Sequence, residues 1–368
     1  MIIAAGGTNT TVGILPLVTG GVAALWTPLV GVFIDRAESR TKVRRTMVFL
    51  STLFGALSIL MIAFVSELGL LLIAFSTMSI SIQTGWTAIN SFLASESEDQ
   101  KLGYVSGFGI TMGYIGGALG AGGAVLLEAY FSRSLALVYV GGFLLVFGIL
   151  PAVFLEDRVN SIRSKMNVTQ SLSESFAVIK SNSSIRAYLV GSILWGDGIS
   201  TIVTFASLIA VQVLLIPLEN ATMFLAMALP AAIIGAFAQG KIGDHVGLVK
   251  SQAANLSLWI VGILIIILGG GMLPIILVAS VAGFALGGNV ALSRALYARI
   301  IPDGMEGRLF GISAIFVFFG GAIGPLLTGL VADISGLSLR YALIVPLIFI
   351  LISLPTLRYI KEQSGPFQ

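Results

Sequence analysis

Acidic side chains are the residues of this 368-residue chain whose positions most suggest chemistry. Asp197 stands about ten residues into an apolar segment of roughly 187–213, between Gly196 and Gly198. At the centre of a bilayer an ionised side chain costs at least about 2.5–3.5 kcal/mol, so it must face water or a partner. It could there carry a proton or balance an amine, and the two glycines would weaken the helix around it. A neutral, hydrogen-bonded structural aspartate is the alternative.

Other polar side chains inside apolar segments could line a cavity for a small polar solute. Gln83, Trp86 and Asn90 recur at i, i+3 and i+7, which places them on one face of a helix. Hydrogen bonds between helices without any ligand are the alternative for each residue taken alone. The remaining candidates are Tyr114, Trp195 and Asn289.

The composition excludes several classes of protein. The chain is 57% hydrophobic and 10% charged, whereas soluble domains carry roughly 25% charge, so we predict an integral membrane protein. Cysteine is absent and there is one histidine, which excludes disulfides and Cys- or His-based metal clusters. The glycine-rich stretches lack the Gly-Lys-Ser/Thr of a phosphate-binding loop, and the apolar segments show no catalytic constellation. We therefore expect no metal, no cofactor and no enzymatic activity.

Eleven apolar segments are each long enough to cross a bilayer, which takes about 20 residues of helix. They are continuous and lack the two-residue alternation of a barrel strand, so the predicted class is all-α. The segments are roughly 13–34, 47–65, 69–93, 103–128, 134–155, 187–213, 221–239, 253–270, 272–298, 309–332 and 340–360.

The cations are distributed unevenly among the connecting segments. Eighteen of the twenty Lys and Arg lie on one side of the predicted topology, and only Arg133 and Arg340 lie on the other. The first side is therefore predicted to be cytoplasmic. An odd number of spans then leaves the N-terminus outside, so we expect one helix to be missing before residue 1. Restoring it would give twelve spans, arranged six plus six.

Two sequence patterns occur twice at nearly one spacing. Gly31-x-x-x-Asp35 is repeated as Gly240-x-x-x-Asp244, with the acids 209 positions apart (244 minus 35). The stretch 101–106 is repeated at 308–313, an offset of 207 (308 minus 101). The chain is therefore predicted to be a duplicated bundle: an N-terminal bundle at 1–155, a linker at 156–186 and a C-terminal six-helix bundle at 187–368.

The linker is predicted to contain a short amphipathic helix. Leu172, Phe176 and Ile179 recur at i, i+4 and i+7, with polar residues on the other positions. Such a helix could lie on the inner membrane surface. A packed linker helix without lipid contact is the equal alternative.

The motif Gly31-x-x-x-Asp35-Arg36, with its basic continuation, resembles the signature loop between helices 2 and 3 of the major facilitator superfamily. From about residue 20 onward, the chain also resembles the vacuole-effluxer-like branch of that superfamily. The stretches that carry the second resemblance are Tyr104-Val-Ser-Gly-Phe-Gly, Gly113-Tyr-Ile-Gly-Gly117, Trp195-Gly-Asp197-Gly198-Ile-Ser-Thr, the segment 287–302, and Phe310-Gly with Gly324-Pro325.

The charged groups at the predicted cytoplasmic ends suggest a gate. Asp35 and Asp244 end helices where a carboxylate can face the positive start of another helix. The resemblance implies that the first of these loops packs near the helix start at Arg308 and opens as the two halves rock. Arg294 could pair with Asp244 or snorkel to the interface. The gate set further includes Gly31, Arg36, Arg40 and Gly240.

Two more expectations concern cations and glycines. Contact with anionic head groups is the preferred interpretation of Arg36, Arg40, Lys42, Arg44 and Arg45. Small residues at four-residue spacing allow helices to approach closely. The resemblance implies a tight, pivoting contact between the fifth and eleventh family helices, with a bend at the proline. The residues concerned are Gly113, Gly117, Gly324 and Pro325.

Together these features predict a secondary transporter that moves a small polar or zwitterionic solute by alternating access. The resemblance implies amino-acid-like cargo, often moved in the efflux sense. Expected partners are the solute, the lipid bilayer and, as an open option, protons; we expect a monomer and no nucleic acid. The plasma membrane is the default location, with a vacuole-like membrane as the alternative. A receptor, scaffold or degenerate paralogue that binds without transporting is the alternative function.

Overall fold

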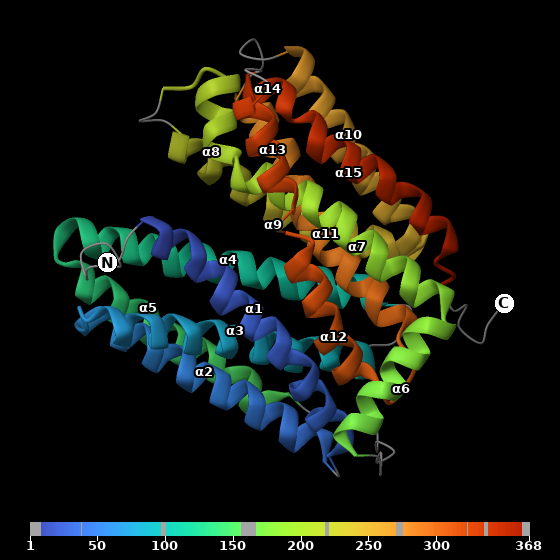
Figure 1. The fold of residues 1–368 in the computed structure, drawn as a ribbon. Coiled ribbons are helices and arrows are strands. Elements are labelled where there is room, and N and C mark those ends of the chain that lie inside the picture. Colours follow the sequence, from blue (N-terminus) through green and yellow to red (C-terminus); the bar gives the residue numbers. More distant parts are fainter. Residues whose placement is uncertain are drawn as a thin grey trace. The chain divides into compact units, whose positions relative to one another are not determined.

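The computed structural model describes residues 9–37, 39–96, 101–155, 167–217, 221–269, 275–321, 323–334 and 338–362. Side chains are described for these residues except 9–17, 95–96, 221–226, 275 and 334. Within the described residues every regular element is a helix, which confirms the predicted all-α class (Figure 1). The chain divides into two compact units. Unit 1 comprises residues 1–96, 116–178 and 301–315, and unit 2 comprises 97–115, 179–300 and 316–368.

Unit 1 is built around four long helices: α1 (Asn9–Arg36), α2 (Arg40–Phe64), α3 (Leu68–Glu96) and α5 (Arg133–Phe154). The α2 helix packs against α3 and α5, and α1 packs against α3. The Ser39 side chain accepts a hydrogen bond from the Lys42 N–H and thereby caps the start of α2. Unit 1 also takes in most of α6 (Val168–Ser181), the second part of α4 (Leu102–Tyr130) and the first part of α12 (Glu306–Phe319).

Unit 2 contains the first part of α4 and the end of α12 together with the remaining helices. These are α7 (Ser183–Thr204), α8 (Ala206–Leu208) with a π-helical turn (Ile209–Val213), α9 (Ala221–Val246), α10 (Leu248–Gly269), α11 (Ile275–Ile300), α13 (Ile323–Ile334), α14 (Leu339–Ala342), α15 (Ile344–Ser353) and a 3₁₀ turn (Leu354–Tyr359).

Small residues explain the close packing of α9 against α11. A Cβ atom added at Gly283 or Gly287 would collide with the backbone carbonyls of Ala228 and Ala232. Only glycine allows the two backbones to approach in this way, as in many pairs of membrane helices.

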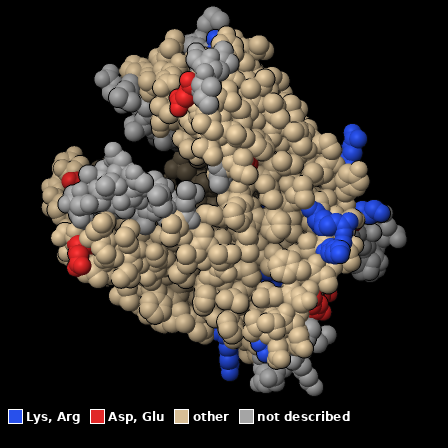
Figure 2. Space-filling view, in the orientation of Figure 1, with Lys and Arg blue, Asp and Glu red and all other residues tan. Residues whose placement is uncertain are grey.

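Nine helices of the described chain are long and apolar enough to span a membrane, or ten if one bent pair counts as a single span. The bent pair, Ser183–Thr204 with Ala206–Val213, turns by 52° where a continuous span 187–213 was predicted. The predicted span 309–332 is confirmed as one candidate span, Glu306–Asp333, within which a turn at Gly320 and Gly321 follows the end of α12 at Phe319. Most of the face seen in Figure 2 carries neither Lys or Arg nor Asp or Glu. The remaining predicted segment, 221–239, lies in α9, whose first side chains are outside the described residues.

The linker contains the predicted helix, α6, over Val168–Ser181. Its buried face is formed by Ser171 and Ser175, whereas Phe176 is exposed. The linker cations Arg158, Arg163 and Lys165 lie outside the described residues.

Candidate functional site: carboxylates at helix starts

Asp35 sits at the start of α12, inside unit 1. Its Oδ1 accepts a hydrogen bond of 2.9 Å from the Gly307 N–H, and its Oδ2 accepts one of 2.9 Å from the Arg308 N–H. These N–H groups belong to the first turn of the helix, where they lack partners within the helix and carry partial positive charge. Gly31, one turn before Asp35, makes the approach possible, because a Cβ there would collide with the Gly307 carbonyl.

An ion network surrounds this carboxylate. The Arg308 Nε lies 3.8 Å from Asp35 Oδ2, and its Nη1 lies 2.6 Å from Glu174 Oε2 on α6. Arg40 Nη1 pairs with Glu306 Oε2 at 3.2 Å, and both side chains are buried. The start of α12 is therefore connected to the end of α1, the start of α2 and the linker helix.

Asp244 makes the equivalent contact inside unit 2. Its Oδ1 accepts a 2.7 Å hydrogen bond from the Gly103 N–H, and its Oδ2 accepts a 2.6 Å bond from the Tyr104 N–H, at the start of α4. A Cβ at Gly240 would collide with the Gly103 carbonyl, and one at Gly103 would collide with the Gly240 carbonyl. The geometry repeats that of Gly31, Asp35 and α12.

The structural correspondence corrects one expected alignment. Gly307 and Gly311 of α12 take the roles of Gly103 and Gly107 of α4, which is an offset of 204 (307 minus 103). A Cβ at Gly311 would collide with the Thr27 carbonyl, and one at Gly107 with that of Ala236. The offset of 207 predicted from residue types was therefore wrong by three positions. The correct offset follows from backbone contacts, which cannot be found by matching residue types.

Asp197 is a third acid at a helix start. Both of its carboxylate oxygens lie 2.8 Å from the Gly324 nitrogen in the first turn of α13, and the side chain is 0% exposed. Its backbone carbonyl accepts hydrogen bonds from Ser200 Oγ at 3.1 Å and Thr201 Oγ1 at 2.7 Å. The deep acid thus ties α7 to the helix that follows the break after α12.

The other predicted solute-binding residues of unit 2 lie in separate places. Trp195 is buried and packs edge-on against Tyr188, with ring centroids 5.6 Å apart. Tyr114 packs against a buried cluster on α4, α9 and α11. Asn289 accepts a 2.8 Å hydrogen bond from Gln252 Nε2. The contacts of Tyr114 and Asn289 are the interhelical packing and hydrogen bonding of the alternative interpretation, whereas Trp195 and Tyr188 both belong to α7.

The α3 candidates of unit 1 differ in exposure. Trp86 is 43% exposed, Gln83 is half-buried and Asn90 is buried. Between them Thr84 accepts a 3.2 Å hydrogen bond from the Trp26 indole N–H of α1. Trp26 is not among the predicted solute-binding residues. The sequence signal for it is a polar indole N–H inside the first apolar segment.

A buried amide cluster in unit 2 was also missed. Asn255 Nδ2 donates to Gln239 Oε1 at 2.7 Å and to the Ala285 carbonyl at 2.8 Å, and Gln239 Nε2 donates to the Phe284 carbonyl at 2.9 Å. The available signal was the pair Gln252 and Asn255, three residues apart in an apolar helix, since such side chains need partners in a membrane.

Two of the cations expected at lipid head groups are instead buried. Arg40 pairs with Glu306, and the Arg44 guanidinium lies 4.9 Å from the centroid of the Phe92 ring. The head-group interpretation was wrong for these two residues because the protein itself supplies their surroundings. Arg36 and Arg45 are half-buried, and Lys42 is exposed. Arg294 Nη1 lies 3.5 Å from the Cβ position of Gly109, and its pairing with Asp244 stays a prediction.

The predicted packing glycines behave differently from one another. A Cβ at Gly324 would collide with the Thr201 hydroxyl and lie 3.0 Å from the Asp197 carbonyl oxygen. At Gly113 and Gly117, by contrast, no described atom of the same unit lies within 4 Å of the Cβ position, and the expected contact between the two halves stays a prediction. Pro325 is the third residue of α13, where its missing N–H costs no hydrogen bond within the helix.

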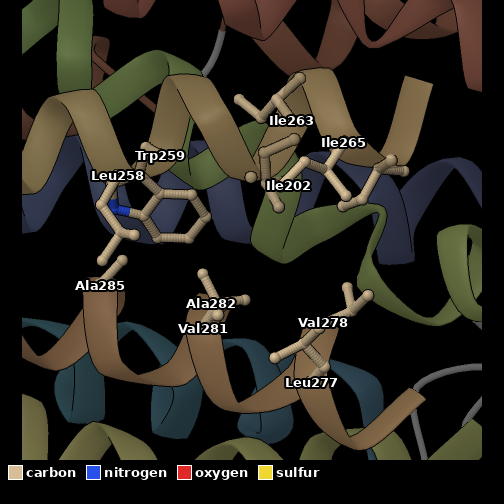
Figure 3. A pocket seen from close by; sticks show the side chains of 12 residues that line it. Ile202, Leu258, Trp259, Ile263, Ile265, Leu277, Val278, Val281, Ala282 and Ala285 are labelled. Carbon is tan, nitrogen blue, oxygen red and sulfur yellow. The ribbon is translucent and has the colours of Figure 1, made fainter. Parts of the chain in front are cut away.

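A cavity of about 190 Å³ lies among α7, α10 and α11 in unit 2 (Figure 3). Its walls are almost wholly apolar and include Ile202, Trp259, Ile263 and Val281. It contains none of the predicted solute-binding residues, and its lining suits hydrocarbon rather than a polar solute.

The fold is that of major facilitator superfamily transporters. A transporter of that superfamily, FucP, solved in the outward conformation, is 16% identical, with a TM-score of 0.79 over 97% of this chain and 91% of that chain. The human organic anion transporter MFSD10 is 18% identical, with a TM-score of 0.74 over 94% of this chain and 83% of that chain.

Residues 93–367 match the family described as vacuole effluxer Atg22 like, and the chain belongs to this family. Autophagy-related protein 22 of Eremothecium gossypii is 25% identical over 73% of this chain, which spans 58% of that protein's length. An uncharacterized MFS-type transporter of Bacillus subtilis, YxiO, is 24% identical over 84% of this chain and 76% of its own.

Proposed function

We propose that this protein is a secondary active transporter that moves a small polar or zwitterionic solute across a membrane by alternating access. The family and the fold support a transporter, and the helices suit a multi-pass membrane protein. The description of the family, vacuole effluxer Atg22 like, favours efflux, and amino-acid-like cargo is the class we would test first. The plasma membrane is the proposed location, with a vacuole-like membrane as the alternative.

The observation that carries the proposal is the pair of equivalent carboxylate contacts. Asp35, from the first sequence repeat, holds the start of α12 from the second, and Asp244, from the second, holds the start of α4 from the first. A carboxylate at a helix start contributes typically 0.3–1 kcal/mol and up to ~2 kcal/mol. Contacts of this strength would stabilise one conformation and are weak enough to break during each transport cycle.

Asp197 is the proposed coupling residue. Its carboxylate accepts a hydrogen bond from the Gly324 N–H at the start of α13, just beyond the turn at Gly320 and Gly321. Binding of a proton, or of a cationic group of the solute, would weaken this contact and free α13 relative to α7. The same acid would therefore bind the ligand and, by releasing the Gly324 N–H, allow α13 to move.

The test is solute flux in proteoliposomes. Candidate amino acids and short peptides would be screened with and without an imposed pH gradient, for the wild type and for Asp197→Asn. We expect saturable flux that the gradient drives in the wild type, and flux without gradient dependence in Asp197→Asn, because the amide cannot exchange a proton.

Glu128→Gln is the matched control, because Glu128 is an exposed acid near the end of α4. Gradient-driven flux that survives in Asp197→Asn would remove the coupling role of Asp197. Solute binding without flux in any version would favour the receptor or scaffold function instead.

A further inference from the structure

The linker helix α6 has an apolar stripe beside the face that it buries. Ser171 and Ser175 are buried, Leu172 and Ile179 are half-buried, and Phe176 is 56% exposed. At 3.6 residues per turn, Leu172, Ile179 and Phe176 follow the buried serines around the helix. The polar residues Ser173 and Lys180 come after them and are exposed. One side of α6 thus meets protein, the next is apolar and the third is polar.

The short connection between α6 and α7 restricts how far the end of α6 can lie from the membrane. The helix ends at Ser181, and α7 begins at Ser183. Asn182 joins them, and its Oδ1 accepts hydrogen bonds from the Ser184 N–H at 2.9 Å and the Ile185 N–H at 3.2 Å, which caps α7. Since α7 begins a candidate membrane span, Ser183–Thr204 with Ala206–Val213, we expect the end of α6 to lie at the level of the membrane surface.

The charges near this junction suit an anionic surface. Lys180 and Arg186 are exposed on either side of Asn182. A basic side chain near an anionic membrane surface strengthens binding to that surface. An apolar stripe flanked by cations is the pattern of a helix that lies in the lipid interface.

The opposite side of α6 holds Arg308. The Arg308 Nη1 lies 2.6 Å from Glu174 Oε2 and donates a hydrogen bond of 3.2 Å to the Ser171 carbonyl. The same residue supplies one of the two N–H groups that Asp35 accepts. Figure 1 shows α6 beside α12 in this region. The Arg308 side chain therefore gives a path by which a displacement of α6 reaches the start of α12.

We infer that α6 binds the anionic lipid surface through Leu172, Phe176 and Ile179 with Lys180 and Arg186, and that Glu174 transmits this binding to the Asp35 contact. Anionic lipid holds α6 in place, α6 holds Arg308, and the start of α12 stays on Asp35. The regulatory part rests on the proposed transport function, whereas the lipid contact does not.

The lipid contact is tested with an environment-sensitive fluorophore on single cysteines, since the chain contains no natural cysteine. Phe176→Cys is compared with its neighbour Ala177→Cys, which is exposed on the polar side of α6. In equimolar phosphatidylcholine and phosphatidylglycerol, we expect blue-shifted emission and quenching by spin-labelled lipid for Phe176→Cys and not for Ala177→Cys. Equal, water-like emission at both positions would overturn the lipid contact.

The coupling is tested by maleimide labelling of Ile34→Cys, which replaces a buried residue facing Gly307. We expect at least a threefold slower reaction in vesicles that contain phosphatidylglycerol than in phosphatidylcholine alone. Glu174→Gln should abolish this difference and leave the Phe176 fluorescence unchanged. Lys180→Gln with Arg186→Gln should abolish both signals.

Thr27→Cys, at the neighbouring contact with Gly311, is the second position in case Ile34→Cys fails to fold. Maleimide labelling rates that are independent of phosphatidylglycerol at both positions would overturn the coupling between α6 and the Asp35 contact. Neither readout requires transport, so failure of the proposed function would appear separately, as an absence of flux.

Discussion

At the scale of single residues, one interaction recurs at three places. Asp35, Asp244 and Asp197 each accept backbone N–H groups in the first turn of a helix that is distant in the sequence. A carboxylate suits this position because it accepts hydrogen bonds and balances the partial positive charge of the helix start. The three acids are therefore the residues at which a loss of charge should matter most.

Replacing either gate acid should loosen one helix start. In Asp35→Asn, Asn keeps one acceptor oxygen but loses the charge, and we expect Ile34→Cys to be labelled by maleimide about 2- to 30-fold faster. That range corresponds to a loss of about 0.5–2 kcal/mol of capping free energy. Glu128→Gln should leave the rate unchanged. A rate in Asp35→Asn equal to that of the parent would show that the carboxylate does not hold α12.

Two substitutions of Asp197 should distinguish its contribution to stability from its proposed role in proton coupling. Asp197→Ala leaves the buried Gly324 N–H without its acceptor, which costs about 1–3 kcal/mol. We expect a clear drop in Tm in detergent for Asp197→Ala and a smaller one for Asp197→Asn, which retains an acceptor. Equal Tm values for Asp197→Ala and the wild type would argue against the contact with α13.

At the scale of helices, glycine decides where two backbones meet. Gly103→Ala would drive a methyl group into the Gly240 carbonyl, and overpacking of this kind typically costs 1–3 kcal/mol. On the same helix, Gly113→Ala meets no described atom of its unit within 4 Å and should be neutral or stabilising by up to about 1 kcal/mol. Thermal unfolding of the two variants measures the difference. The reverse order of Tm would contradict the packing of α4 on α9.

The sequence predicted the helical class and the linker helix, because long apolar segments and a regular apolar period are local properties. It also singled out Asp35, Asp244 and Asp197, since acids are conspicuous in so apolar a chain. It predicted the span 309–332, which is a single candidate span at Glu306–Asp333, but not the turn at Gly320 and Gly321, where hydropathy continues unbroken. The correct offset between the repeats at α4 and α12, and the burial of Arg44, were missed for a related reason. Both depend on contacts between distant segments, which no periodicity records.

At the scale of the whole molecule, the two repeats are joined by contacts of one kind. Asp35 links the end of α1 to α12, and Asp244 links the end of α9 to α4, each within one compact unit. Both contacts lie beside cation-rich connections at the predicted cytoplasmic end. In the proposed alternating-access cycle both contacts would break and re-form, so we expect the two acids to influence flux equally.

The most direct test is the initial rate of solute flux in proteoliposomes for the wild type, Asp35→Asn, Asp244→Asn and the Glu128→Gln control. We predict that each gate variant loses at least about tenfold in rate, which corresponds to roughly 1.4 kcal/mol, while the control keeps the wild-type rate. Wild-type flux in both gate variants would contradict the role of the paired carboxylates, and the absence of flux from every version would contradict transport itself.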